Sequence, residues 1–305
     1  MTGTLTSMLS SGRVAHAFLI YGENGLGKKT LAGDFAARIV AFGGDQRGVH
    51  PRSHPDIQWV ERSGVRQGYS VDTLRKLCTD AYIRPNNGDR KVYILADCDN
   101  ISISAQNTLL KIVEEPPAFA HFIFTAGSKS IFLPTILSRV IAFGVTECSP
   151  EDCRRALQDN GISDAEQIDE AISAFGGNVG LCLEYLQGGE LRQAVELTRQ
   201  LTDFLCLGSE YGVLKTLSAL EAGRGLAKNV LTLMDKVVRD SIAAKSLPES
   251  RIGCYTRGSE RLAEVYSSRK AVRLHELLTE SVHALDGNAN ASMELSALCG
   301  RIYNL

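Results

Sequence analysis

A glycine-rich loop between an apolar run and a helix-like stretch is the feature that most constrains the fold of this 305-residue chain. The run Ala17–Tyr21 reads AFLIY, and GENGLGKKT follows at residues 22–30, after which apolar residues recur at helical spacing to Phe42. Glycines let backbone N–H groups converge on phosphate oxygens, and the positive end of the helix adds to the attraction. GxxxxGK also arises by chance, but between a strand and a helix it predicts a mononucleotide-binding α/β domain.

The loop contains most of the predicted nucleotide contacts. Its backbone freedom comes from three glycines, Gly22, Gly25 and Gly27. Lys28 can reach the outer phosphates. The next position is normally Ser or Thr, whose hydroxyl ligates Mg²⁺, but here it is Lys29, and Thr30 is rotated about 100° around the helix and should not replace it. We therefore do not expect this chain to hydrolyse Mg·ATP competently.

Strand-like and helix-like stretches alternate in the first half of the chain, and the strands stop near residue 145. We predict further strands at 56–60, 90–96 and 122–125, and helices at 71–82 and 104–115. This alternation is typical of a parallel sheet with helices on both faces. Helical periodicity continues from residue 150 to the end, interrupted by a predicted hinge at Gly188–Gly189. The expected domains are an α/β domain at 1–145, a small helical domain at 146–188 and a helical domain at 189–305.

Two polar residues near the predicted sheet are further candidates, and each has two interpretations. Asp97 follows the buried strand, where a P-loop ATPase places the carboxylates that hold the metal and orient the attacking water, but it could simply begin a polar loop. Arg139 lies in LPTILSRV, residues 133–140. It is either one partner of a surface salt bridge or an arginine finger presented to a neighbour's nucleotide. The residues alone leave both questions open.

Composition excludes several classes of protein. The net charge is −2, and residues 1–146 carry 16 Lys/Arg against 12 Asp/Glu, which is too mild for a stand-alone DNA-binding protein. No apolar run approaches the length of a membrane span and no secretory signal is recognisable, so we expect a soluble, cytoplasmic protein. The eight scattered cysteines, without CxxC, are expected to be buried free thiols. His50 and His54 are each followed by proline and are not expected to bind a metal.

Five segments together resemble the AAA+ clamp-loader family. They are GRVAHAFL (12–19), SHPD (53–56), NTLLKIVEEPP (107–117), TILSR (135–139) and NANASMEL (288–295). The third and fourth are the most specific, and TILSR leads into the position of the family's Ser-Arg-Cys motif, with Val140 in place of the cysteine. The resemblance covers almost the whole chain. It implies an α/β P-loop domain with a parallel sheet, then a small helical lid domain and an all-α collar domain that joins subunits.

The resemblance also implies roles for individual residues. Ser138 and Arg139 would form the finger motif, and the sensor-1 residue would be Thr125 or Ser128. Counting back from the Glu-Glu pair at 114–115 places the family's metal-holding Asp on Ala96 and its water-orienting Glu on Asp97. Gly180 stands where motor subunits carry the sensor-2 arginine. Both magnesium-binding groups are therefore expected to be missing.

The implied function is that of a largely non-hydrolysing subunit of the bacterial DNA polymerase III clamp loader. It would supply Arg139 in trans and help load the sliding clamp onto primed DNA. The expected partners are the motor and delta subunits and, through them, the clamp and DNA, with no membrane involved. No cofactor is required, although ATP or ADP could bind without hydrolysis, and the cysteine-free segment 42–53 implies that the zinc module of some members is absent. The alternatives are an autonomous AAA+ ATPase of the motor type and a P-loop scaffold of a DNA-repair assembly.

Overall fold

The computed structural model describes residues 14–41, 49–62, 68–221, 223–244, 252–287 and 289–305. The chain divides into two compact units, Met1–Thr146 and Glu147–Leu305. Gly12, Arg13, Phe42 and Asn288, which contribute to the sequence patterns above, lie outside the described residues.

A five-stranded parallel sheet forms the centre of the first unit and has the order β2-β3-β4-β1-β5. The strands are β1 (Ala17–Tyr21), β2 (Ile57–Trp59), β3 (Lys91–Leu95), β4 (Ala120–Ala126) and β5 (Ile141–Gly144). β3 and β4 are buried along their whole length, as expected for strands covered on both faces. The predicted parallel sheet is confirmed. β5 is not among the predicted strands, because its apolar run, residues 140–143, is only four residues long and is too short to assign from periodicity. In the structure its residues alternate between half-buried and exposed at the edge of the sheet.

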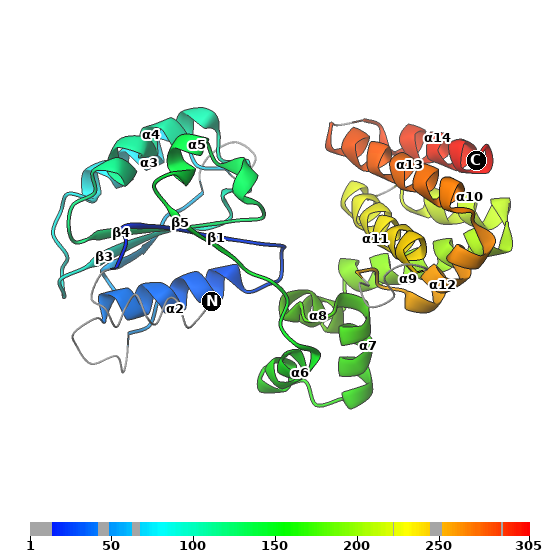
Figure 1. The fold of residues 1–305 in the computed structure, drawn as a ribbon, viewed down its shortest axis with the longest axis horizontal. Coiled ribbons are helices and arrows are strands. Elements are labelled where there is room, and N and C mark those ends of the chain that lie inside the picture. Colours follow the sequence, from blue (N-terminus) through cyan, green and yellow to red (C-terminus); the bar gives the residue numbers. More distant parts are fainter. Residues whose placement is uncertain (1–13, 42–48, 63–67, 222, 245–251, 288) are drawn as a thin grey trace. The chain divides into compact units, whose positions relative to one another are not determined.

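Helices cover both faces of this sheet (Figure 1). They are α2 (Lys28–Val40), α3 (Val71–Asp80), α4 (Ile103–Glu114) and the short α5 (Pro134–Leu137), with two 3-10 helices, η2 (Cys98–Asn100) and η3 (Lys129–Ile131). On one face Phe35 and Ile39 of α2 pack against Phe18 of β1. On the other, Leu74 of α3 and Leu109 of α4 belong to the same apolar cluster as several buried strand residues. This packing fixes the ends of β1, β3 and β4, from which the candidate site is built.

The second unit is helical throughout its described residues, as predicted. Its helices are α6 (Pro150–Asp159), α7 (Ala165–Phe175), α8 (Val179–Leu186), α9 (Glu190–Leu207), α10 (Glu210–Ala219), α11 (Arg224–Ala243), α12 (Thr256–Val265), α13 (Ser268–Asp286) and α14 (Ala291–Tyr303). α11 packs against α9, α12 and α13. Gly188 and Gly189 both have positive φ in the turn between α8 and α9, which suits the glycine pair found there. The division of this unit into lid and collar at residue 188 stays a prediction.

The cysteine prediction is correct in part. All eight are free thiols, and Cys98, Cys153, Cys182, Cys254 and Cys299 are buried. Cys148 is exposed, because it lies in the extended segment that precedes α6. No group of metal-binding side chains occurs among the described residues, and none of their helices is both long and apolar enough to cross a bilayer.

Candidate functional site

The loop after β1 has the backbone of a phosphate-binding loop. Gly25 and Gly27 have φ values of 84° and 73°, in the left-handed region that glycine adopts without strain. A Cβ on Gly22 would lie 2.4 Å from the carbonyl oxygen of Val145, so only glycine fits where the loop passes the end of β5. α2 begins immediately at Lys28. Its first backbone N–H groups have no partner within the helix and carry its positive end charge into the loop.

The Lys28 ammonium lies inside this loop. Its Nζ donates to the carbonyl oxygens of Gly22 and Glu23, both at 2.7 Å, and the residue is only 7% exposed. Burial lowers the pKa of Lys28, and the nearby carboxylates of Asp99 and Asp97 oppose that shift. The ammonium is therefore placed where a phosphate oxygen could take over from the loop carbonyls.

Lys29 forms an ion pair with Asp97 across the end of the sheet. Lys29 Nζ lies 2.5 Å from Asp97 Oδ2, and the guanidinium of Arg62 lies 3.2 Å from the same oxygen. The structure thus brings together two predicted site residues. Arg62 is a third participant that sequence reasoning missed, because no motif links it to a carboxylate 35 positions further along the chain.

The backbone of Asp97 is fixed by its neighbours. Asp97 is the only non-glycine residue of the described part with a positive φ, 53°, a conformation that L-residues seldom adopt. Its N–H donates to the hydroxyl of the buried Thr125 at 2.9 Å, and the hydroxyl of Tyr69 donates to the carbonyl of Ala96 at 2.6 Å. Of the two sensor-1 candidates, Thr125 is therefore the one beside Asp97. Ser128 instead accepts the N–H of Ser130 at the start of η3.

These residues do not fit a magnesium ion. Mg²⁺ requires oxygen ligands in near-octahedral geometry at 2.0–2.1 Å. The position of the usual hydroxyl carries the Lys29 ammonium, Ala96 offers no side-chain ligand, and Asp97 already accepts two cations. Thr30 is exposed on α2. No magnesium-dependent step can be assigned to this loop.

Arg139 lies on the short connection between α5 and β5. Its Nη1 donates to the carbonyl oxygen of Thr135 and to the hydroxyl of Ser138, both at 2.9 Å, and its Nη2 contacts the carboxylate of Glu114 at the end of α4. The side chain remains 35% exposed. The surface ion pair that the sequence allowed is therefore present, and it holds the guanidinium in one orientation at the surface.

Gln106 anchors the segment that leads to Arg139. Its side chain is buried, its Nε2 donates to the carbonyl of Ile131 at 2.9 Å, and its Oε1 accepts the N–H of Leu133 at 2.7 Å. Both partners directly precede α5. Gln106 was not predicted, because it lies just before the segment NTLLKIVEEPP and its neighbours indicate only an amphipathic helix.

Arg139 and the phosphate loop lie at opposite ends of the parallel strands. All five strands are parallel, Arg139 precedes β5, and the loop follows β1. β1 and β5 are paired in register, from Phe18 with Ile141 to Tyr21 with Gly144. At about 3.3 Å per residue, the paired length of the strands alone separates their two ends by ~10 Å. The side chain of Arg139 is held toward Glu114. The guanidinium is not part of this chain's own phosphate loop.

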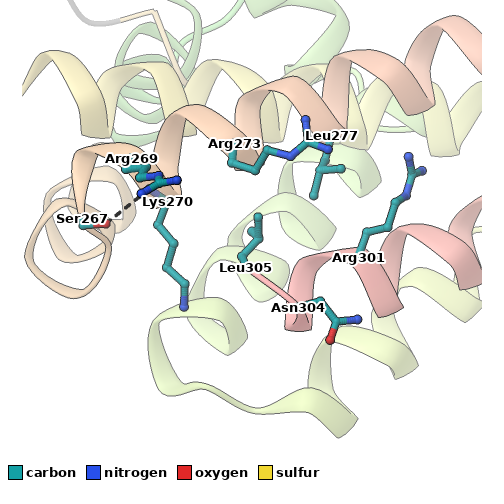
Figure 2. A pocket seen from close by; sticks show the side chains of 8 residues that line it. All are labelled: Ser267, Arg269, Lys270, Arg273, Leu277, Arg301, Asn304 and Leu305. Carbon is teal, nitrogen blue, oxygen red and sulfur yellow. Dashed lines mark hydrogen bonds between the residues drawn. The ribbon is translucent and has the colours of Figure 1, made fainter.

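A second group of cations lines a cavity of about 690 Å³ in the helical unit (Figure 2). Its charged lining residues are Arg269, Lys270, Arg273 and Arg301. Arg273 forms ion pairs with Glu276 and Glu280, and Arg301 pairs with Glu280 and Glu294. Because these glutamates offset the arginines, and none of the predicted site residues lies here, we assign no ligand to this cavity.

The fold and the loop define a class. A glycine-rich loop that follows β1 and opens α2, in a parallel sheet of order β2-β3-β4-β1-β5, followed by a helical unit, is the arrangement of a P-loop protein of the AAA+ class.

Sequence comparison narrows this class. Residues 1–148 match the family described as DNA polymerase III, delta subunit. The delta' subunit of DNA polymerase III from Pseudomonas aeruginosa is 30% identical over 193 residues, which are 59% of this chain and 58% of that protein. The delta' subunit from Haemophilus influenzae is 30% identical over 61% of this chain and 59% of its own length. The gamma/tau subunit from Mycobacterium bovis is 29% identical over 56% of this chain and 31% of its own length.

Residues 1–148 thus match the model of the DNA polymerase III delta-subunit family, and the chain is similar in sequence to delta' and gamma/tau subunits of DNA polymerase III. The matched regions span less than two thirds of these relatives. The family match, residues 1–148, includes both the phosphate loop and Arg139.

Proposed function

We propose that this chain is a non-hydrolysing subunit of a DNA polymerase III clamp loader that supplies Arg139 to the ATP site of a neighbouring subunit. In that role it works with motor and delta subunits in the cytoplasm and helps them load the sliding clamp onto primed DNA. Its homology to delta' and gamma/tau subunits supports the assembly. The residues of the first unit support the proposal that a neighbouring subunit, and not this chain, hydrolyses the ATP.

The observation that carries the proposal is the position of Arg139. Arg139 lies at the end of the strands opposite to its own phosphate loop, so it does not contact a nucleotide bound in that loop. At the surface, it is available to a nucleotide held by another chain. Thr135, Ser138 and Glu114 hold the guanidinium in advance, so little side-chain freedom is lost when it meets a phosphate.

The chemistry asked of Arg139 is electrostatic. A guanidinium close to a transferring phosphoryl group neutralises charge that develops on its oxygens, and an arginine finger supplied in trans raises the rate by ~10³–10⁵. Ser138 and Glu114 are positioning residues in this scheme, since they contact the arginine. The ion pair between Lys29 and Asp97 supports the non-hydrolysing part of the proposal, because an ammonium replaces the magnesium-binding hydroxyl and engages the carboxylate at the position of the water-orienting residue.

The test is ATP hydrolysis by a complex reconstituted with its motor and delta subunits. With Arg139→Ala, the site served by this chain should lose ~10³–10⁵ in rate, and the total rate should fall by that site's share. Arg139→Lys should recover little of the loss, because an ammonium lacks the planar fork. Arg38→Ala, which removes an exposed arginine paired with Asp34 on α2, is the matched control and should not alter hydrolysis. Unchanged hydrolysis by a folded Arg139→Ala complex would refute the proposal.

A further inference from the structure

Two consecutive lysines, rather than one, face the phosphate loop with different partners. Lys28 donates to the loop carbonyls of Gly22 and Glu23. Lys29 lies 2.5 Å from Asp97. The first is the lysine that every GxxxxGK loop has, and the second replaces the hydroxyl that would ligate magnesium. The Lys29 ammonium is thus paired with the carboxylate of Asp97, just after β3. In hydrolysing relatives the acidic side chains at this place hold the metal and orient the attacking water.

The charges around this ion pair favour a phosphate rather than a metal. An ammonium has three donor hydrogens, and the contact with Asp97 uses one of them, which leaves two for phosphate oxygens. The guanidinium of Arg62 lies 3.2 Å from Asp97, so two cations offset one carboxylate. Lys29 is 48% exposed, and solvent or a ligand can reach it. Lys28, Lys29 and the positive end of α2 together form a cationic site, in which Asp97 is paired with two cations and the carboxylate of Asp99 accepts the N–H of Gly127.

We propose that this loop binds the phosphates of a nucleoside di- or triphosphate without a divalent cation, with the Lys29 ammonium in the electrostatic role that Mg²⁺ has in hydrolysing P-loop proteins. Asp97 holds the ammonium in place, and Arg62 prevents the carboxylate from repelling the phosphate. The inference rests on the proposed function only in treating the loop as non-hydrolysing. What it adds is a metal-free mode of binding for the nucleotide that the phosphate loop implies.

Titration of the purified full chain with ADP and with ATP, in excess Mg²⁺ and in excess EDTA, tests the inference. The wild-type Kd should agree within ~threefold between the two conditions. Lys29→Met removes the ammonium and keeps a side chain of similar length, and it should weaken binding ~tenfold or more in both conditions. Lys29→Thr restores the usual hydroxyl and frees Asp97, so binding should weaken in EDTA and recover in part with Mg²⁺. Arg38→Ala is the control at the far end of α2 and should bind as the wild type does.

Several results would overturn the inference. They are no nucleotide binding in either condition, a wild-type affinity at least tenfold higher with Mg²⁺, or wild-type affinity in Lys29→Met. Tryptophan fluorescence and circular dichroism establish that each variant is folded, and Lys29→Thr serves if Lys29→Met is not. The Arg139→Ala experiment measures hydrolysis of a nucleotide held by a neighbouring subunit, whereas the titration measures binding to this chain's own loop. Either result can therefore contradict its own proposal without contradicting the other.

Discussion

Mild acid should destabilise the first unit through one buried imidazole. His121, near the start of β4, is 2% exposed. Its Nδ1 lies 2.9 Å from the carbonyl oxygen of Ala15, which can only accept, so Nδ1 carries the proton of the neutral ring. Its Nε2 is buried with no hydrogen-bond partner among the described residues. The ring also stacks on His16, with centroids 5.3 Å apart. A second proton on Nε2 would therefore be buried and unpaired.

The size of the effect follows from the pKa of this ring. Burial lowers the pKa of His121 from 6.5 to about 4. Between these two values the unfolded chain binds a proton that the folded chain does not, so stability falls as the pH falls through that window. Going from pH 7 to pH 5 should cost the first unit about 2 kcal/mol, and the full shift is worth about 3 kcal/mol below pH 4.

Urea unfolding followed by tryptophan fluorescence measures this cost. Trp59 is the only tryptophan of the chain and lies on β2, so its signal reports on the first unit alone. His121→Asn places an amide nitrogen near the position of Nδ1 and does not titrate, so its loss between pH 7 and pH 5 should be about 2 kcal/mol smaller than that of the wild type. His50→Asn, at an exposed histidine of the same unit, should leave the wild-type pH dependence unchanged. Equal pH dependence in the wild type and His121→Asn would refute the reasoning.

Three further substitutions have definite expected outcomes. Asp80→Ala removes the carboxylate that lies 2.7 Å from the Lys91 ammonium, which is only 2% exposed, and should destabilise the first unit by ~3–5 kcal/mol in the Trp59 assay. Adding Lys91→Met should recover only the part due to the unpaired ammonium, because the buried Tyr93 hydroxyl also loses Asp80 as its acceptor. Gly177→Ala would place a Cβ 1.8 Å from the carbonyl oxygen of Cys148, so circular dichroism should show a lower melting temperature for the second unit, and an unchanged one would contradict the expected clash. Gly300→Ala, on α14 where a Cβ meets nothing within 4 Å, should instead raise stability by ~0.5–1 kcal/mol in the same measurement.

Much of the fold can be predicted from the sequence because its signals are local. Ala17–Tyr21 is an apolar run that becomes a strand with the predicted bounds, since a strand buried on both faces needs no alternation. α2 and α4 begin and end within a few residues of the expected positions, because Gly27 and Ser102 stand at their starts and Pro116 prevents α4 from continuing. β5 and α5 are too short to show a period, and yet they determine where Arg139 lies.

The contacts that define the site are not predictable in the same way. Lys29 and Asp97 can be identified individually, but their ion pair depends on the relative positions of β1, β3 and β4 in the sheet. Arg62 is distant in the sequence and joins Asp97 only in the folded chain. Gln106 lies within an ordinary amphipathic helix and acquires its role from the loop that folds back onto it. Residue type and spacing indicate which groups are present, whereas the sheet order decides which of them meet.

The most direct measurement for this chain is phosphate release from ATP by the purified protein alone, in Mg²⁺, over many equivalents of ATP. Lys28→Ala, prepared in the same way, measures any contaminating activity. We expect the two preparations to release phosphate at the same background rate, because the Lys29 ammonium replaces the magnesium-binding hydroxyl and is paired with Asp97. Turnover by the wild type that is lost in Lys28→Ala would contradict this, and would identify the chain as an ATPase in its own right.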